Sequence, residues 1–599
     1  MNSAGNLIEE ARRLLRDGDP ARAAVLCRSI IQADPQNFDA FYLLGFLHGQ
    51  SHEYDEAQYL FGEASKRNPA STDAFFMRGF ALQKLARDEE AISAFGQALA
   101  VNPHLAEALL NRAASLFRLR RYEEAARDYE NLLALEPDFP FARGNLLFSR
   151  LHGCDWRGFA EEQAAIRKGL AARERVVAPF DAKALDLSAD DELSCAKLWV
   201  ADQYKTTARL PRGGSQTHRR IRLAYVSADF HIHAMATLMA GVFEKHDRTR
   251  FETLAISLGP NDGSGMRTRL NRAFDRFIDV RGKSDAEIAA LMQEMEIDIA
   301  VDLMGFTEGC RPGIFAHRPA PVQANYLGFP GTMGADFMDY LIADEIVAPM
   351  GQHRHYTESV VTLPGSFMPA DSTRAIGSRL FTRAELGLPS KGFVFTCFNA
   401  SYKITPPIFA SWMRLLETVE GSVLWLGQAN DSARQNLRLE AESRGIAGNR
   451  LVFASYLPSA ADHLARLKLA DLFLDTLPYN AHATAADALW AGLPVLTCMG
   501  NRFAGRVAAS LLHAAGLAEL VTDSLADYEA KARELARDPA ALDAIKARLQ
   551  RNRATHSLFD TARFTRNLEK SYLTMWDRRQ HGLPPQSFAV GEATADHPA

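Results

Sequence analysis

The pattern of apolar and polar residues changes once along this chain, near residue 219. Before that point the chain has the periodicity of successive amphipathic helices. After it, short apolar runs alternate with helical stretches, which predicts strands in parallel sheets. The runs occupy residues 221–226, 251–258, 297–303 and 322–326, and then 393–398, 422–426, 451–453, 472–474 and 495–497.

These strand runs form two groups, which predicts two doubly wound, Rossmann-like halves. The pattern restarts at residue 393, so we place the halves at 216–378 and 379–580, joined near 365–390. Ligands of open parallel sheets bind at the carboxyl ends of the strands. We therefore expect a substrate cleft between the halves, with the final helices (about 525–578) crossing back over it. Residues 581–599 are polar, and we expect them to be a disordered tail.

The helical region contains a repeat of 34 residues. Prolines recur at that interval, small residues occupy two further positions of each unit, and a larger side chain occupies another. The aligned sets are Pro35, Pro69, Pro103 and Pro137; Ala11, Gly45, Gly79 and Ala113; Ala23, Ala57, Ala91 and Ala125; and Cys27, Phe61, Phe95 and Tyr129. This period is typical of a tetratricopeptide array, which we place at 1–140, with a helical cap or linker at 141–215. Such an α-solenoid binds peptides or partner proteins on its curved surface.

Composition narrows the class of protein. The 599 residues are 47% apolar and 24% charged, which are ordinary globular values. A net charge of −5 gives no support for a nucleic-acid or acidic-membrane partner. No apolar run reaches the length of a membrane span, and the amino terminus enters an amphipathic helix, so we expect neither a membrane segment nor a signal peptide. The six scattered cysteines suggest reduced thiols in the cytoplasm and no zinc site.

The segment most informative about chemistry is residues 475–497, DTLPYNAHATAADALWAGLPVLT. It predicts the end of a strand, a turn, a helix that starts at His482, Ala483 and Thr484, and a further strand. A helix that begins past the carboxyl end of a strand directs free N–H groups and a positive dipole end at a ligand. Small residues, a hydroxyl and an imidazole suit a nucleotide diphosphate. The alternative is an ordinary αβ unit that binds nothing.

The motifs of two common nucleotide-binding classes are missing. No G-x-G-x-x-G follows the first strand, and no G-x-x-x-x-G-K-[ST] occurs, which argues against a dehydrogenase or a P-loop NTPase. No D-x-D stands near the expected cleft, so a departing diphosphate needs protein cations and helix starts. Lys403, which follows the strand at 393–398, could supply such a cation; the alternative is a solvated surface lysine.

Together these motifs resemble one family. The chain is similar over nearly its whole length to the protein O-linked N-acetylglucosamine transferases and SPINDLY-like proteins, which are glycosyltransferases of the GT-B fold. The motifs that carry the resemblance are YVSADFHIHAMATLM, DLMGFTEGCRPGIFAHRPAPVQANYLGFPGTMGADFMDY, CFNASYKITP, LPSAADHLARLKLADLFLDTLPYNAHATAADALWAGLPVLT and GRVAASLL. The implied fold is α + α/β, a tetratricopeptide α-solenoid followed by two Rossmann-like domains, of which the first faces the acceptor and the second binds the nucleotide sugar.

The resemblance also implies roles for individual residues. Lys403 would neutralise the donor diphosphate, with His233 as a candidate proton acceptor or positioning group facing the acceptor. The implied nucleotide-sugar contacts are His463 and Arg466 at the base, His482, Ala483 and Thr484 at the phosphates, and Asp487 at the ribose. The reaction would be an inverting, metal-independent transfer to a Ser or Thr hydroxyl, without a cofactor besides the nucleotide-sugar substrate.

Four positions depart from the family pattern. Ala400 replaces a usual glutamine, Ala483 a usual threonine, Asp298 a histidine of the animal enzymes, and Ala460 a lysine near the ribose. The leading hypothesis is transfer of N-acetylglucosamine from UDP-GlcNAc to a protein held by the repeats. One alternative keeps the fold with GDP-fucose or a nucleotide-activated nonulosonic acid as donor, and flagellin as a candidate acceptor. The other alternative is an inactive binding scaffold.

Overall fold

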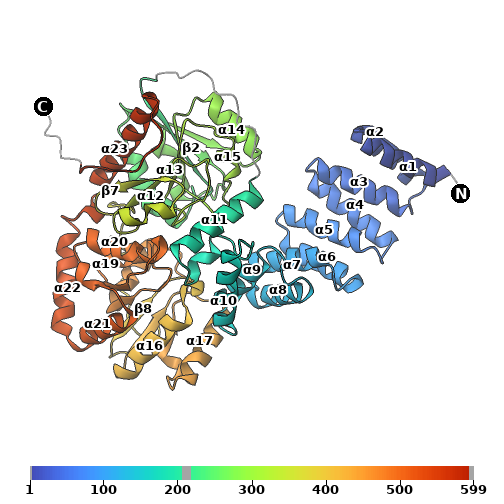
Figure 1. The fold of residues 1–599 in the computed structure, drawn as a ribbon. Helices are drawn as coiled ribbons and strands as arrows, with labels where there is room; N and C mark the ends of the chain where they lie inside the picture. Colours follow the sequence, from blue (N-terminus) through green and yellow to red (C-terminus); the bar gives the residue numbers. More distant parts are fainter. Residues whose placement is uncertain (1–2, 205–217, 593–599) are drawn as a thin grey trace. The chain divides into compact units, whose positions relative to one another are not determined.

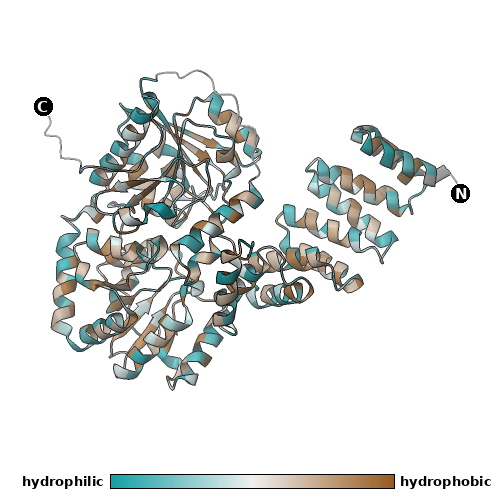
Figure 2. Ribbon diagram, in the orientation of Figure 1, coloured by the Kyte–Doolittle hydropathy of each residue, from teal (hydrophilic) through white to brown (hydrophobic). Residues whose placement is uncertain are grey.

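The computed structural model describes residues 3–204 and 218–592 (Figure 1). The chain divides into two compact units, Met1–Gly153 and Cys154–Ala599. None of the helices in the described ranges is both long and apolar enough to cross a membrane. Figure 2 shows that the strands of the second unit consist mainly of hydrophobic residues, and these form its core.

The first unit is a stack of helices, as the repeats predicted. The helices are α1 (Ser3–Arg16), α2 (Pro20–Ala33), α3 (Phe38–Gln50), α4 (Tyr54–Arg67), α5 (Thr72–Lys84), α6 (Asp88–Val101), α7 (Ala106–Arg118), α8 (Tyr122–Leu135) and α9 (Ala142–His152). Each helix packs against the next. A methyl group added at Gly79 would come within 2.7 Å of the Phe95 ring, so the small residues of the repeat lie where helices cross closely. The unit extends past the expected end at residue 140 because α9 packs on α8.

The first Rossmann-like half contains an eight-stranded parallel sheet in the order β14-β7-β6-β5-β4-β1-β2-β3. Its strands are β1 (Ile221–Ser227), β2 (Phe251–Ser257), β3 (Arg276–Asp279), β4 (Ile299–Asp302), β5 (Val322–Tyr326), β6 (Tyr340–Asp344), β7 (Ser359–Leu363) and β14 (Phe588–Ala589). Its helices are α12 (Ala234–Lys245), α13 (Gly265–Ala273), α14 (Asp285–Glu294) and α15 (Gly313–Ala316).

The second half contains a six-stranded parallel sheet in the order β10-β9-β8-β11-β12-β13. Its strands are β8 (Val394–Cys397), β9 (Val423–Leu426), β10 (Leu451–Phe453), β11 (Leu472–Leu474), β12 (Val495–Cys498) and β13 (Val521–Thr522). Its helices are α16 (Pro406–Thr418), α17 (Asp431–Ser443), α18 (Ala460–Arg466), α19 (Ala483–Ala491), α20 (Val507–Ala514), α21 (Leu525–Arg537) and α22 (Pro539–Asn552). All nine strand runs read from the sequence are strands in the two sheets.

The end of the chain returns to the first half. Helix α23 (Thr561–Gln580) packs against α12, and in Figure 1 its dark red ribbon lies among the green elements. The buried His246 Nδ1 lies 2.9 Å from Glu569 Oε1. Beyond α23, Phe588 pairs with Val361 of β7. Helix α23 therefore crosses back to the first half, as expected of the final helices, whereas the expected disorder of the tail is wrong for β14; residues 593–599 lie outside the described ranges.

The segment between the repeats and the first strand contributes three helical elements to the second unit. They are α10 (Phe159–Ala171), the 3₁₀ helix η1 (Asp181–Ala184) and α11 (Ala189–Gln203). A Ser188 capping box starts α11, with Asp191 as the reciprocal partner. Residues 205–215 of the expected linker lie outside the described ranges.

Candidate functional site

The segment 475–497 has the local structure that its sequence predicted. Strand β11 leads into a turn, and α19 begins at Ala483 with His482 at the N-cap. The buried Asp475 organises this turn, since its carboxylate accepts hydrogen bonds from Ala481 N at 2.6 Å and from Thr497 Oγ1 at 2.6 Å. Gly492, with φ of 86°, ends the helix in the left-handed conformation. The first N–H groups of α19 have no partner within the helix, and the helix begins after the carboxyl end of β11.

Lys403 lies against this turn. It ends the 3₁₀ helix η3 (Ser401–Lys403), which follows β8, and it is only 8% exposed. Its Nζ donates to Asn480 O at 2.8 Å and lies 3.7 Å from the centre of the Tyr479 ring. Burial lowers the Lys403 pKa to about 7, against the opposing charge of Asp475. The alternative of a solvated surface lysine is thus excluded, and the free protein holds a cation that is easily neutralised.

His482 is already engaged by the protein. Its Nε2 lies 3.2 Å from Ala504 O, and a carbonyl only accepts, so Nε2 carries the proton. Burial, with the charge of Lys403, lowers the His482 pKa well below its usual value. The neutral ring then offers only an acceptor at Nδ1. The ring N–H group that was expected to donate to the phosphates therefore donates to Ala504 O. The ring can offer a second donor, at Nδ1, only when it gains a second proton.

Thr484 is held across the sheet by a neighbouring loop. Its Oγ1 donates to Asn399 Oδ1 at 2.5 Å, and Asn399 Nδ2 donates to Thr476 Oγ1 at 2.7 Å. Asn399 follows β8 and lies four residues before Lys403. The loop after β8 and the start of α19 are therefore one hydrogen-bonded unit, which we call the diphosphate grip: Asn399, Lys403, Asn480, His482 and Thr484.

His463 and Arg466 form a fixed pair on α18. Arg466 Nη2 lies 2.8 Å from His463 Nδ1, and because a guanidinium only donates, Nδ1 is the acceptor and Nε2 carries the proton. Burial and the Arg466 charge lower the His463 pKa. Arg466 also donates to Ser455 O at 2.6 Å and lies over the Phe398 ring at 5.0 Å. The pair thus presents one neutral imidazole beside the loop after β8.

Asp487 has a partner that sequence reasoning missed. Its Oδ1 lies 2.7 Å from Arg374 Nη2, and Arg374 belongs to the segment that joins the two halves. Trp490 Nε1 donates to Arg374 O at 3.2 Å. The carboxylate assigned to the ribose is therefore also an anchor for this joint. No motif surrounds Arg374, so nothing in the sequence pattern pointed to it.

His233 is the one predicted site residue on the first half. It caps α12 after β1, with its side chain 45% exposed. Its Nδ1 lies 3.2 Å from Asp229 Oδ2 and accepts from Met235 N at 3.3 Å. Burial and the nearby His231 lower the His233 pKa, while burial raises that of Asp229 to about 6. With Nδ1 accepting from Met235 N, the neutral ring carries its proton on Nε2, so Nδ1 is the nitrogen that can act as a general base, in exchange for this contact.

Residues 192–378 and 374–568 match the family described as glycosyl transferase family 41, and residues 14–75, 72–105 and 106–139 match tetratricopeptide repeats. The chain belongs to glycosyl transferase family 41. Its structure resembles a lysine-to-methionine mutant of the Thermobaculum terrenum O-GlcNAc transferase, with a TM-score of 0.64 and 28% identity over 97% of this chain and 98% of that one. The resemblance and fold class predicted from the motifs are confirmed.

The chain is also similar to two curated proteins. It is 35% identical over 467 residues to the Arabidopsis thaliana protein named "Probable UDP-N-acetylglucosamine--peptide N-acetylglucosaminyltransferase SEC", covering 74% of this chain and 48% of that protein. It is 30% identical over 374 residues to the Solanum lycopersicum protein of the same enzyme name, SPINDLY, covering 61% of this chain and 40% of that protein. The chain spans less than half the length of these relatives.

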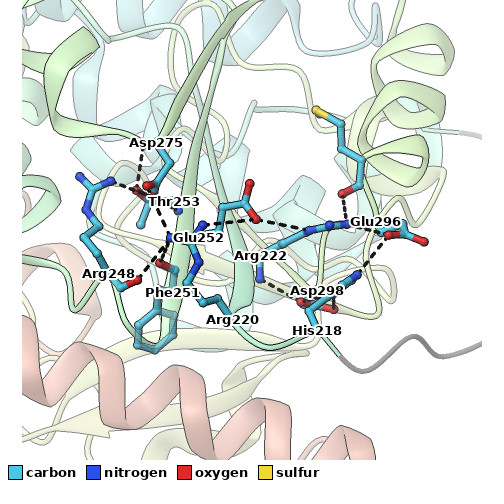
Figure 3. Close-up of polar contacts among 11 residues, drawn as sticks. His218, Arg220, Arg222, Arg248, Phe251, Glu252, Thr253, Asp275, Glu296 and Asp298 are labelled. Carbon is cyan, nitrogen blue, oxygen red and sulfur yellow. Dashed lines mark hydrogen bonds and ion pairs between the residues drawn. The ribbon is translucent and has the colours of Figure 1, made fainter.

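One of the departures from the family 41 pattern is remote from the strand ends that form the site. Asp298 precedes β4 at the amino end of the first sheet, where it accepts from Arg222 N at 2.9 Å. Figure 3 shows it beside His218, whose Nδ1 lies 3.0 Å from Asp298 Oδ2. The other ring nitrogen, Nε2, lies 3.1 Å from Glu296 Oε2. Ligands of such sheets bind at the opposite, carboxyl edge, so Asp298 lies away from the expected site.

Two other departures adjoin residues of the grip in the sequence. Ala400 is exposed at the N-cap of η3, and Ala483 is the first residue of α19. Ala460 begins α18. Within residues 3–204 and 218–592, no group of three or more His, Cys, Asp or Glu side chains is placed to hold a metal ion.

Proposed function

We propose that this family 41 protein transfers a sugar from a nucleoside-diphosphate donor to Ser or Thr hydroxyls of a protein, with UDP-GlcNAc as the donor. The observation that carries the proposal is the burial of Lys403 against the start of α19. A buried cation beside free helix N–H groups suits a diphosphate. The enzyme names of the relatives support the choice of donor and acceptor.

The proposed reaction is an inverting displacement. The acceptor hydroxyl oxygen attacks the anomeric carbon while the bond to the diphosphate oxygen breaks on the opposite face. His233 takes the hydroxyl proton on Nδ1, in exchange for the contact of that atom with Met235 N, and the nucleoside diphosphate leaves with the bonding electron pair. Lys403 and the α19 start take up the charge that develops on it, so we propose that no metal is required. Alignment of the hydroxyl with the anomeric carbon supplies the rest of the acceleration.

Nucleotide binding is expected to raise the melting temperature of the full chain. A ligand that binds only the folded state stabilises it in proportion to its affinity, so UDP should give the largest shift among UDP, GDP and CMP. Intact mass of candidate acceptors, flagellin among them, after co-expression should then increase by one N-acetylhexosamine. A larger shift with GDP or CMP, or an added deoxyhexose or nonulosonic acid, would replace the donor. No nucleotide shift and no added mass would favour a scaffold.

Donor affinity should depend on pH through Lys403. Its pKa is about 7 in the free protein, where the facing groups are Asp475, Cys397 and His482. Above that pH the lysine is mostly neutral, and diphosphate binding must recharge it. We therefore expect the affinity for UDP to fall by roughly tenfold per pH unit above pH 7. Calorimetry between pH 6 and 9 measures this slope and the proton taken up.

The matched controls are two lysine variants. Lys403→Met should bind UDP more weakly and lose the slope, whereas Lys468→Met, which changes an exposed lysine of the same half, should retain it. An affinity that stays constant across this range in the wild type would contradict charging of Lys403 by the donor.

A further inference from the structure

A buried cluster of three charges lies behind the diphosphate grip. Glu192 Oε1 lies 3.0 Å from Lys183 Nζ and 2.6 Å from Arg502 Nη1. Lys183 and Arg502 are each 2% exposed and Glu192 is 8% exposed. We call these residues the buried ion triad. Two basic side chains face one carboxylate, and burial lowers the Lys183 pKa against the attraction of Glu192.

The triad joins the linker to both Rossmann-like halves. Lys183 belongs to η1 and Glu192 to α11, whereas Arg502 belongs to the loop after β12 of the second half. On the first half, Lys183 Nζ lies 4.6 Å from the centre of the Phe329 ring. A methyl group at Gly331 would come within 2.5 Å of the same nitrogen. The triad therefore lies where the linker meets both halves, and Glu192 is its only carboxylate.

The loop held by the triad continues directly into the grip. Arg502 also donates to the carbonyls of Ala182 and Leu185 of the linker. It precedes the 3₁₀ helix η6 (Phe503–Gly505), whose Ala504 O accepts from Asn480 N at 3.0 Å and lies 3.2 Å from His482 Nε2.

The packing of η6 leaves little room for movement. A methyl group at Gly505 would come within 2.7 Å of Pro478 O. Because Asn480 O is the acceptor of Lys403 Nζ, a displacement of Arg502 would pass through η6 to the residues that hold the diphosphate.

Holding η6 in place does not by itself require the buried charges of the triad. Burial of ions removes their hydration, and well-packed apolar residues commonly stabilise such a joint as well or better. The positive charge of Lys183 reaches the site, where it helps to keep His482 neutral. The triad therefore fixes the position of η6, and Lys183 makes a minor contribution to the neutral state of His482.

We propose that Glu192 is a positioning residue for the diphosphate grip, acting through Arg502 and the Ala504 carbonyl. The inference rests on the proposed function, because it assigns the grip to a leaving diphosphate. Residues that bind a leaving diphosphate stabilise the transition state most strongly, because the charge on the leaving group develops there. The base-side pair, His463 and Arg466, lies on α18 and is anchored to Ser455 rather than to η6.

The test is the kinetics of Glu192→Gln in the full chain, measured as release of UDP from UDP-GlcNAc. The amide keeps the side-chain shape but leaves Arg502 and Lys183 without a counter-charge. We expect kcat to fall about 100-fold, as small misplacements of catalytic groups do, while KM changes less than about threefold. The control is Asp190→Asn on the same helix, whose side chain is 81% exposed; it should show wild-type values.

Two further variants keep the inference testable. Arg502→Lys retains a cation against Glu192 but loses the fork that reaches Ala182 and Leu185, so kcat should fall about tenfold even if Glu192→Gln does not fold. Lys183→Met keeps the Glu192–Arg502 pair and should affect kcat less than either. Folded Glu192→Gln or Arg502→Lys enzyme with wild-type kcat overturns the inference. A wild type that neither binds UDP nor releases it from UDP-GlcNAc overturns the proposed function instead.

Discussion

Lys403→Met is expected to reduce sugar transfer by several orders of magnitude while the melting temperature stays the same or rises. The loss follows because the full leaving-group charge exists only in the transition state, where this buried cation acts. The rate of sugar transfer to a protein and of UDP release measures it. Near-normal turnover would contradict the proposed mechanism, whichever sugar the donor carries.

Lys403→Met should lower activity but not stability, because the buried lysine itself destabilises the folded state. The Lys403 pKa is about 7 when folded, below that of an unfolded lysine. The unfolded chain binds the proton more strongly, so burial of this lysine lowers stability fully below pH 7, and the penalty fades as pH rises toward 10. The gain from methionine should therefore be largest at or below pH 7. Thermal melts across this range check it, with Lys468→Met as the exposed-lysine control.

Removal of residues 1–153 is expected to abolish modification of the natural protein acceptor while sparing release of UDP from UDP-GlcNAc. The deleted residues form a compact unit of their own, and the grip lies wholly in the other unit. A helical array binds an extended chain over many repeats, so its loss should remove recognition and leave bond cleavage intact. Both activities are measured on the same truncated preparation.

A short Ser- or Thr-containing peptide supplies the control for this deletion. Because it is too short to depend on the array, it should be modified equally slowly by the full and the truncated chain. Efficient modification of the natural acceptor by the truncated chain would show that the repeats are not its recognition surface.

Much of the fold could be predicted because it is encoded over short distances in the chain. The 34-residue repeat places small residues such as Gly79 at helix crossings, and this spacing survives in any sequence that keeps the array. The strand runs and the α19 start are equally local, since the turn, the N-cap and Gly492 lie within one segment. Lys403 could be placed near them because parallel strands bring their carboxyl ends to one edge.

The end of the chain illustrates where local reasoning fails. Residues 581–592 lack an apolar run of ordinary strand length, so they read as a disordered tail. In the structure Phe588 and Ala589 form an edge strand because β7 offers them unpaired backbone groups. The partner that orders this segment lies more than 200 residues away in the sequence, and composition carries no record of it.

The sequence by itself determined the architecture, the family resemblance and the residue types of the grip. Only the tertiary structure decided their chemical states: a Lys403 with a lowered pKa, a His482 whose proton faces Ala504, and an Asp487 paired with Arg374. It also brought Glu192 to Arg502, which is 310 residues away along the chain. The physical reason is the distance along the chain over which each effect acts. Periodicity and capping act between near neighbours, whereas burial, protonation and ion pairing depend on which distant segments the fold brings into contact.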